Sequence, residues 1–300
     1  MIRAQGSVAA GSGGELVSVT YAQDRLVDVL WAKSALSQLN VDSMLGVQNN
    51  MIIPVATTKA TGTWGANDLA ATPAAQGITT SSLNMFPKPL ATHTAFSRLL
   101  NIQSYPGMEA RTYDQLFKAI IQSLDDALFA AANVTNAPLS VLAAITQVVA
   151  LGANGLAPTQ AGIIKLIDTL EKLNLDPHSI AFVTNTSVKN TLCQTLKDST
   201  NSASNYILPS FEAKDLYGKP LAISNNIPAN LTKGTGTNLS ALISGIWSDL
   251  AVAQWGAIEV IRDDNDTYND QLIHVKSFSY WDALIKRNAS FAVIKDIITL

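Results

Sequence analysis

Hydrophobic side chains recur every three or four residues in four stretches of the chain, which is the spacing of one face of an α-helix. The stretches are 22–39, 109–132, 159–173 and 187–198. Glu109 favours a helix start at the second stretch, and Asn185 or Thr186 is expected to cap the last. The predicted inward positions are Leu116, Phe117, Ile120, Ile121, Leu124, Leu128 and Ala131 in the second stretch, and Ile163, Ile164, Ile167 and Leu170 in the third.

Shorter apolar runs predict β-strands, and most of them lie in the C-terminal half of the chain. They fall near 47–55, 82–86, 90–97, 180–184, 220–224, 240–246, 249–254, 257–262, 271–280 and 283–294. Pro54 is expected to break the first of them. Helices followed by gathered strands indicate a mixed α+β fold.

Residues 56–82 have an unusual composition, because only Trp64, Leu69 and Ile78 are large and apolar. So few buried groups cannot offset the entropy lost when the segment is ordered. We therefore expect this loop either to be disordered or to be ordered by lying on another molecule. Trp64 is the aromatic side chain that would dock on a neighbouring subunit, and the alternative is that it folds back on its own hairpin.

Charged residues make up only 14% of the 300 residues, against roughly 25% in ordinary domains. Two explanations remain open: much of the surface is covered in the working state, or Ser, Thr and Asn replace charge on an exposed surface. The net charge is −3 and no basic run occurs, which argues against a dedicated nucleic-acid binder. The single cysteine, Cys193, excludes an intramolecular disulfide and fits a reducing cytoplasm.

Candidate chemistry is sparse. His93, His178 and His274 lie far apart in sequence without ligand-spaced partners, so we interpret them as structural. The acidic run 263–270 lacks the Gly and Glu of a calcium loop, which favours an exposed polar turn over weak cation binding between subunits. Cys193 is expected to be a packed thiol, since no activating base is near it in sequence. We expect no catalytic, cofactor or metal site.

Three segments of the last third have a recognisable order. His178-Ser-Ile-Ala-Phe-Val-Thr-Asn185 reads as a strand ending on an Asn cap, and Leu216-Tyr-Gly-Lys-Pro leads through a tight turn into a short strand. Trp255-Gly-Ala-Ile-Glu-Val-Ile-Arg-Asp263 reads as a strand ending in Arg-Asp. This succession resembles the major capsid proteins of tailed bacteriophages, which have the Hong Kong phage capsid fold.

The resemblance implies a division of the whole chain into the parts of that fold. The Gly/Ser-rich start and the first helix resemble an N-arm, and the 47–97 hairpin resembles the extended E-loop, which in the family lies over a neighbouring subunit. The helix 109–132 resembles the spine helix of the P-domain. The expected parts are 1–46 (N-arm), 47–97 (E-loop), 98–137 (P-domain with spine helix), 138–256 (A-domain) and 257–300 (P-domain strands).

The resemblance has two departures. The arm begins almost at Met1, so a scaffolding segment carried by many relatives has been removed or is supplied by a separate protein. Some relatives also cross-link an E-loop Lys to a P-domain Asn with the help of a buried Glu. Lys59 fits the Lys, but Gln271 stands at the Asn position and Phe278 at the Glu position, so we do not expect covalent cross-linking. Asp282 is the alternative base.

The function implied is that of a structural protein, not an enzyme, which assembles into pentamers and hexamers of an icosahedral shell around double-stranded DNA. Candidate contacts between subunits are Lys59, Trp64 and Leu69. Expected partners are other copies of the chain, portal and scaffolding proteins, a decoration protein in some shells, and DNA without specificity; no membrane is expected. The expected location is the virion, after assembly in the host cytoplasm. The rival functions are an encapsulin-type shell around an enzyme cargo and a soluble hydrolase.

Overall fold

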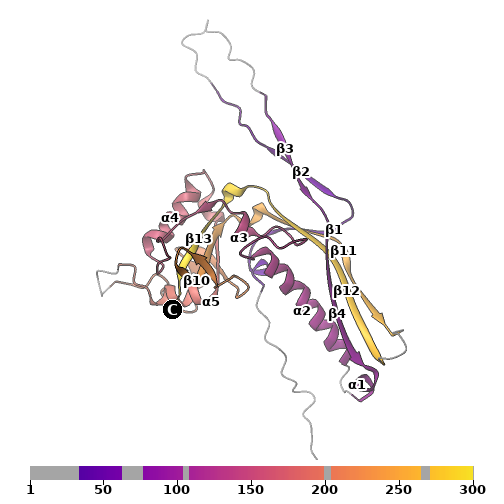
Figure 1. Cartoon of the computed structure of the whole chain (residues 1–300). Helices are drawn as coiled ribbons and strands as arrows, with labels where there is room; N and C mark the ends of the chain where they lie inside the picture. The colour runs from indigo at the N-terminus through magenta and orange to yellow at the C-terminus, as the bar shows by residue number, and fades with distance from the viewer. Residues whose placement is uncertain (1–33, 63–76, 104–107, 199–203, 265–270, 300) are drawn as a thin grey trace, which may run out of the picture.

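The computed structural model describes residues 34–62, 77–103, 108–198, 204–264 and 271–299 (Figure 1). These residues form a four-stranded sheet, a seven-stranded sheet and a separate two-stranded hairpin. The predicted mixed α+β class is confirmed. Most of the predicted helix 22–39 lies outside the described residues. Its described end is a single 3-10 turn, η3 (Leu36–Gln38), followed by extended backbone at Leu39, so the helix does not continue to residue 39.

The four-stranded sheet, called the long sheet below, runs in the order β1-β11-β12-β4. Its strands are β1 (Asp42–Val47), β11 (Leu250–Asp263), β12 (Leu272–Ile285) and β4 (Lys88–Ser97). The short helix α1 (Arg98–Gln103) follows β4, and α2 (Met108–Leu128) then runs along one face of the sheet (Figure 1). Leu116 of α2 packs with Phe96, Ile273 and Val275 of the sheet.

Helix α2 confirms the predicted long helix but ends at Leu128, so Ala131 lies beyond it and is exposed. Ile120 and Leu128 are fully buried, while Phe117 and Ile121 are 40% and 52% exposed, contrary to the prediction. Each follows an inward residue by one position, which is a rotation of about 100° around the helix. The sheet covers a narrower face of α2 than the apolar pattern suggests.

The seven-stranded sheet has the order β5-β13-β10-β6-β8-β7, with β9 paired to β10. Its strands are β5 (Gln147–Val148), β13 (Phe291–Ile298), β10 (Gly236–Gly245), β6 (Ala181–Thr184), β8 (Lys219–Ile223), β7 (Asp215–Leu216) and β9 (Leu231–Lys233). Successive residues of β10 enter two different cores: Ala241 and Ile243 pack in one, and Leu242 packs in the other. A strand buried on both faces reads as a continuous apolar run.

Helices α3 (Val141–Ala144), α4 (Gln160–Glu171) and α5 (Thr186–Gln194) accompany this sheet. Thr159 caps α4 by accepting a hydrogen bond from Gly162 N at 3.2 Å, and Asn185 caps α5 by accepting one from Val188 N at 2.9 Å. The choice between Asn185 and Thr186 is therefore settled. Ile164 is 48% exposed and does not face inward as predicted.

The predicted strand boundaries need three corrections. The stretch 47–55 is divided between β1 and the hairpin strand β2 (Met51–Ala56), and Pro54 lies inside β2. Pro is tolerated there because β2 pairs on one side only, with β3 (Thr80–Met85). The two predicted strands 249–254 and 257–262 form the single strand β11 (Leu250–Asp263), which has a register shift between Trp255 and Glu259 beside Gly256, whose φ is 63°.

The last correction concerns the end of the chain. Strand β12 continues to Ile285, and the chain reverses through the 3-10 turn η6 (Asn288–Ser290). Strand β13 then pairs with β10 and β5, so it lies in the seven-stranded sheet and not beside β12. Strand β11 likewise crosses residue 256. The strand groups therefore do not follow the expected boundary at 256, and the capsid-domain division of the chain stays a prediction.

Candidate assembly surfaces

The hairpin β2–β3 projects away from the rest of the molecule (Figure 1). Its register runs from Met51 opposite Met85 to Ala56 opposite Thr80. Beyond the strand ends it continues through polar contacts, since Thr57 N donates to Thr79 O at 2.8 Å and the two hydroxyl oxygens lie 2.7 Å apart. Hydrogen bonds of this kind stabilise the pairing without supplying a hydrophobic core.

The candidate contact residues lie on or beyond this hairpin. Lys59 is exposed just after β2, while Trp64 and Leu69 lie outside the described residues. Ile52 and Ile78 are 65% and 64% exposed, a feature that the polar composition of the segment concealed. Two large apolar side chains therefore face solvent on an arm that carries little charge.

The root of the hairpin is fixed to the long sheet. Met51 and Ile53 pack on a small cluster that contains Met85 and Trp255. Asp282, which is 5% exposed, accepts a hydrogen bond from Phe86 N at 3.0 Å and pairs with Lys88 Nζ at 2.9 Å. The hairpin thus has a defined direction relative to the sheet, although its outer part packs on nothing in its own chain among the described residues.

The face of the long sheet opposite α2 is also open. Cross-strand register brings Glu259, Phe278 and Ala91 side by side on this face. Tyr280 and Ile261 on the same face are 45% and 41% exposed. We call this surface the outer face of the long sheet. It offers partly exposed aromatic and aliphatic side chains, together with the carboxylate of Glu259 and the ion pair of Asp263 with Lys276.

The residues considered for cross-linking are placed by the same register. Gln271 is exposed directly before β12, with a φ of 47°, and its carbonyl accepts a hydrogen bond from Arg98 N at 3.0 Å. Phe278 is half-buried on the outer face, and the carboxylate of Glu259 stands on the neighbouring strand directly across from it. Sequence reasoning missed Glu259, because only the β11–β12 register brings it there. Asp282 is already engaged at the hairpin root.

Two of the three histidines meet on the outer face, which their separation in sequence did not reveal. His93 Nε2 lies 2.7 Å from His274 Nδ1, and the rings stack with centroids 5.0 Å apart. His93 lies on β4 and His274 near the start of β12, on neighbouring strands of the long sheet. Within the described part of the chain, no group of three or more His, Cys, Asp or Glu side chains is arranged to bind a metal ion.

The other candidate chemistry has structural explanations. Cys193 lies 3.8 Å from the carbonyl of Ser210 and packs beside the second core, and burial raises the pKa of its thiol. Of the acidic run 263–270, Asp263 and Asp264 are described and pair with Lys276 and Arg262. Residues 265–270 lie outside the description, so the turn itself stays a prediction.

The three tryptophans among the described residues, Trp247, Trp255 and Trp281, have different surroundings. Trp247 is buried against Phe291 with ring centroids 5.3 Å apart. Trp255 is 6% exposed and donates from Nε1 to Asn49 O at 2.9 Å, which ties the β1–β2 connection to the long sheet. Trp281 is half-buried. Those described are therefore anchors within the subunit.

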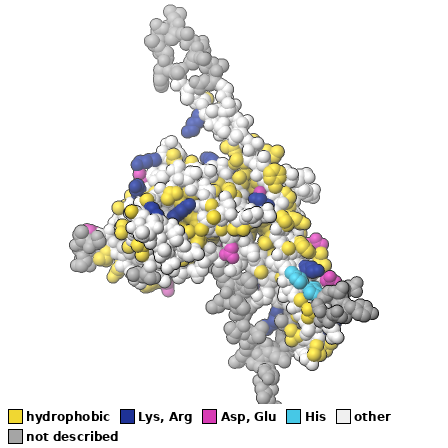
Figure 2. All heavy atoms as spheres, in the orientation of Figure 1, with side chains coloured by type: hydrophobic (Ala, Val, Ile, Leu, Met, Phe, Trp, Pro, Cys, Tyr) yellow, Lys and Arg dark blue, Asp and Glu magenta, His cyan; other side chains and the backbone are white. Residues whose placement is uncertain are grey.

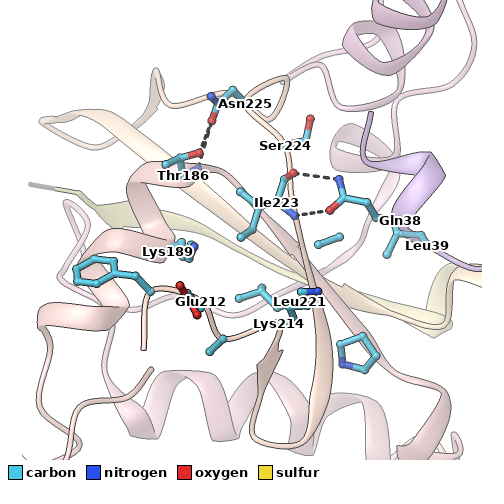
Figure 3. A pocket seen from close by; sticks show the side chains of 14 residues that line it. Gln38, Leu39, Thr186, Lys189, Glu212, Lys214, Leu221, Ile223, Ser224 and Asn225 are labelled. Atoms are coloured by element: carbon cyan, nitrogen blue, oxygen red, sulfur yellow. Dashed lines mark hydrogen bonds between the residues drawn. The ribbon is translucent and has the colours of Figure 1, made fainter. Parts of the chain in front are cut away.

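A pocket of about 730 Å³ opens along the edge of β8 (Figure 3). The side-chain amide of Gln38 fills part of this edge: Nε2 donates to Ile223 O at 3.1 Å, and Oε1 accepts from Ile223 N at 3.4 Å. Thr186 and Asn225 lie at one end, where Thr186 Oγ1 donates to Asn225 Oδ1 at 2.6 Å. The hydroxyl of Thr186 is therefore engaged by Asn225.

Charge is sparse over the visible face of the molecule, where uncharged polar and apolar atoms predominate (Figure 2). Among the described residues, no α-helix is both long and apolar enough to cross a bilayer. The surface features that stand out are thus the projecting hairpin and the open outer face of the long sheet.

Comparisons with known proteins give a consistent result. A sequence model described as the phage capsid family matches residues 13–296. No curated protein gives a significant match. The capsid of a native GTA particle has the same fold, with a TM-score of 0.79, 17% identity and coverage of 98% of this chain and 99% of that chain. A chain of Gordonia phage Cozz gives a TM-score of 0.72 at 15% identity, covering 97% and 95%. A chain of Microbacterium phage Oxtober96 gives 0.74 at 13%, covering 96% and 99%.

Proposed function

This chain belongs to the phage capsid family, and from that premise we propose that its hairpin β2–β3 serves as an inter-subunit strap in an icosahedral shell. The protein is a structural major capsid protein located in the virion. The outer part of the hairpin would lie over a neighbouring copy, with the outer face of the long sheet as the receiving surface. Lys59, Trp64 and Leu69 are the proposed contacts nearest the tip.

One observation carries the proposal: the hairpin has almost no core of its own and still exposes Ile52 and Ile78. An isolated two-stranded hairpin is marginally stable in water. Covering such side chains on a neighbour removes apolar area from water at about 25 cal/mol per Å². Repeated around a closed ring, contacts that are individually weak add up to a stable assembly.

The rest of the proposal concerns partners and contents. We propose pentamers and hexamers, and in addition portal, scaffolding and, in some shells, decoration proteins as partners. The DNA would be held without sequence specificity, because the chain has a net charge of −3 and no basic run. No catalytic role is proposed, since Cys193 packs beside the second core and Thr186 in the pocket along β8 is hydrogen-bonded to Asn225.

The test is to replace residues 57–79 by a short Gly-rich turn. We expect the subunit to keep its circular dichroism spectrum and its unfolding midpoint, because the deleted part contributes almost nothing to the cores. Electron microscopy should show that closed shells no longer form. Loss of the fold in this variant would contradict the proposal, as would normal shells.

A finer version uses point variants. Ile52→Ser with Ile78→Ser should weaken assembly, whereas Ser81→Ala with Ser82→Ala, also exposed on the hairpin, should not. Equal assembly of the two double variants would show that the exposed isoleucines are not contacts. A closed shell that the wild-type chain forms without DNA would still count as the proposed icosahedral assembly. An enzyme found as the natural cargo would instead favour the encapsulin-type alternative.

A further inference from the structure

Helix α2 contains a fully buried carboxylate whose polar contacts come from other parts of the chain. Asp125 is 0% exposed. Its Oδ1 accepts a hydrogen bond from Ser34 Oγ at 3.1 Å, and its Oδ2 accepts one from Ala35 N at 2.9 Å. Asn226 Nδ2 lies 3.5 Å from Oδ2. One side chain therefore joins α2, the start of the described chain and the loop that follows β8.

The segment 34–39 is held at a second point by Gln38. Its amide bonds to both backbone groups of Ile223, as Figure 3 shows, and it also donates to Ser34 O at 2.9 Å. Residues 34–39 thus contact α2 at one end and the edge of β8 at the other. The Asp125 end lies next to the 33 residues that precede Ser34 in the sequence.

Among the described residues, no cation neutralises the charge of Asp125; Lys33, directly before Ser34 in the sequence, lies outside them. Segment 34–39 and residues 224–227 carry no ionisable side chain, and the nearest charged group on α2 is another acid, Asp126. Burial therefore raises the pKa of Asp125; the hydrogen bonds from Ser34, Ala35 and Asn226 act in the opposite direction but are outweighed. A buried carboxylate without a cation is costly in its ionised form.

We propose that Asp125 is a proton-sensitive latch, which holds residues 34–39 on α2 more tightly when its carboxyl group is protonated. Releasing the segment exposes the carboxylate to water, which favours the ionised form. The latch therefore has its full stability at pH values below the ordinary Asp pKa of about 3.9. Since the pKa in the latched state is raised, that stability decreases as the pH rises through the higher value.

The hydrogen bonds remain compatible with protonation. A hydroxyl can accept as well as donate, so Ser34 Oγ can change from donating to Oδ1 to accepting from a protonated Oδ1. Oδ2 keeps its bond from Ala35 N. Protonation thus removes a buried charge without leaving a buried donor unpaired, and mild acid strengthens the attachment of the N-terminal segment to the spine of the subunit.

Hydrogen exchange of the peptide containing residues 34–39 tests the latch in purified, unassembled full-length protein. Exchange rates divided by the intrinsic chemical rates should fall in the wild type as the pH is lowered from 8 towards the ordinary Asp pKa of about 3.9. The normalised exchange rate can change at most about tenfold for each unit by which the pKa of Asp125 in the latched state exceeds its pKa in the released state. Asp125→Asn, which is neutral at every pH, should abolish this dependence. Asp114→Asn, at an exposed position of the same helix, should leave it unchanged.

A second variant keeps the test decisive if Asp125→Asn does not fold. Ser34→Ala leaves the carboxylate in place but removes a donor to its charged form, so the midpoint of the pH dependence should move to higher pH. A wild-type profile without pH dependence would overturn the proposal, as would an unmoved midpoint in Ser34→Ala. This test uses unassembled chains, so it does not depend on whether the hairpin contacts a neighbouring subunit. Either proposal can therefore fail without affecting the other.

Discussion

The hairpin β2–β3 and the seven-stranded sheet differ in where their hydrophobic side chains lie. In the hairpin, Met85 at the root is the one buried residue of either strand, and Ile52 points into solvent. In β10 every residue from Leu239 to Gly245 is buried, with successive side chains entering cores on both faces of the sheet. Both regions are β-structure, but only one completes its own core.

The seven-stranded sheet is stabilised by contacts within one subunit, whereas we propose that the outer part of the hairpin is stabilised by contacts with a neighbouring subunit. The seven-stranded sheet and its helices bury enough apolar surface to offset the entropy of ordering. The hairpin cannot do so, and its threonine contacts at Thr57 and Thr79 are exposed to water. The low charge content of this arm is consistent with our proposal that another copy covers it, because interface cores are depleted in charge.

The largest expected effect comes from the core of the seven-stranded sheet. Phe291 is fully buried against Trp247, and Phe291→Ala should lower the free energy of unfolding by about 3–5 kcal/mol. Urea unfolding of unassembled protein followed by fluorescence measures this. Ile52→Ala is the matched hairpin variant and should change the same quantity by less than about 0.5 kcal/mol. Equal losses would mean that the hairpin contributes to the fold of the single subunit.

The root of the hairpin should show an intermediate effect. Asp282→Ala removes the acceptor of Phe86 N and the partner of Lys88, which should cost about 1–3 kcal/mol and speed hydrogen exchange in 80–90. Lys88→Met keeps the bond from Phe86 N but leaves the nearly buried carboxylate of Asp282 without its cation, so it should also lower the free energy of unfolding while speeding hydrogen exchange in 80–90 less than Asp282→Ala does. Equal acceleration of exchange in the two variants would mean that the ion pair, and not the backbone contact, fixes the root.

The periodic patterns of the sequence were sufficient for the elements with one buried face. Helix α2, the Asn185 cap and the turn at Tyr217 and Gly218, with φ values of 53° and 73°, were all predictable from spacing and turn chemistry. The width of the buried face of each element was not predictable. Phe117 and Ile121 continue the apolar pattern of α2 around the helix, and only the width of the sheet beneath decides which of these residues are covered.

Contacts between distant segments could not be predicted, because they depend on strand register and on loops. Glu259 reaches Phe278 through the pairing of β11 with β12, and His93 reaches His274 through the pairing of β12 with β4. Asp125 stands next to Asp126 in the sequence, and nothing in that stretch distinguishes it as the residue that contacts Ser34, Ala35 and Asn226. The assignments of Trp64 and Leu69 as contacts stay predictions.

The smallest expected effect is that of Lys59→Ala on covalent structure, since we predict that mature shells are held non-covalently. Isopeptide formation needs a base to accept a proton from the Lys amine. Phe278 stands where that base is expected, and an amide without assistance resists a protonated amine. Particles boiled in detergent should therefore give one band near 31.9 kDa with or without Lys59. A ladder of covalent multimers that Lys59→Ala abolishes would contradict this prediction.

If such a ladder were found, Glu259 would be the first candidate for the base, because it is exposed beside Phe278 whereas Asp282 is already hydrogen-bonded at the hairpin root. Glu259→Gln should then abolish the ladder as well.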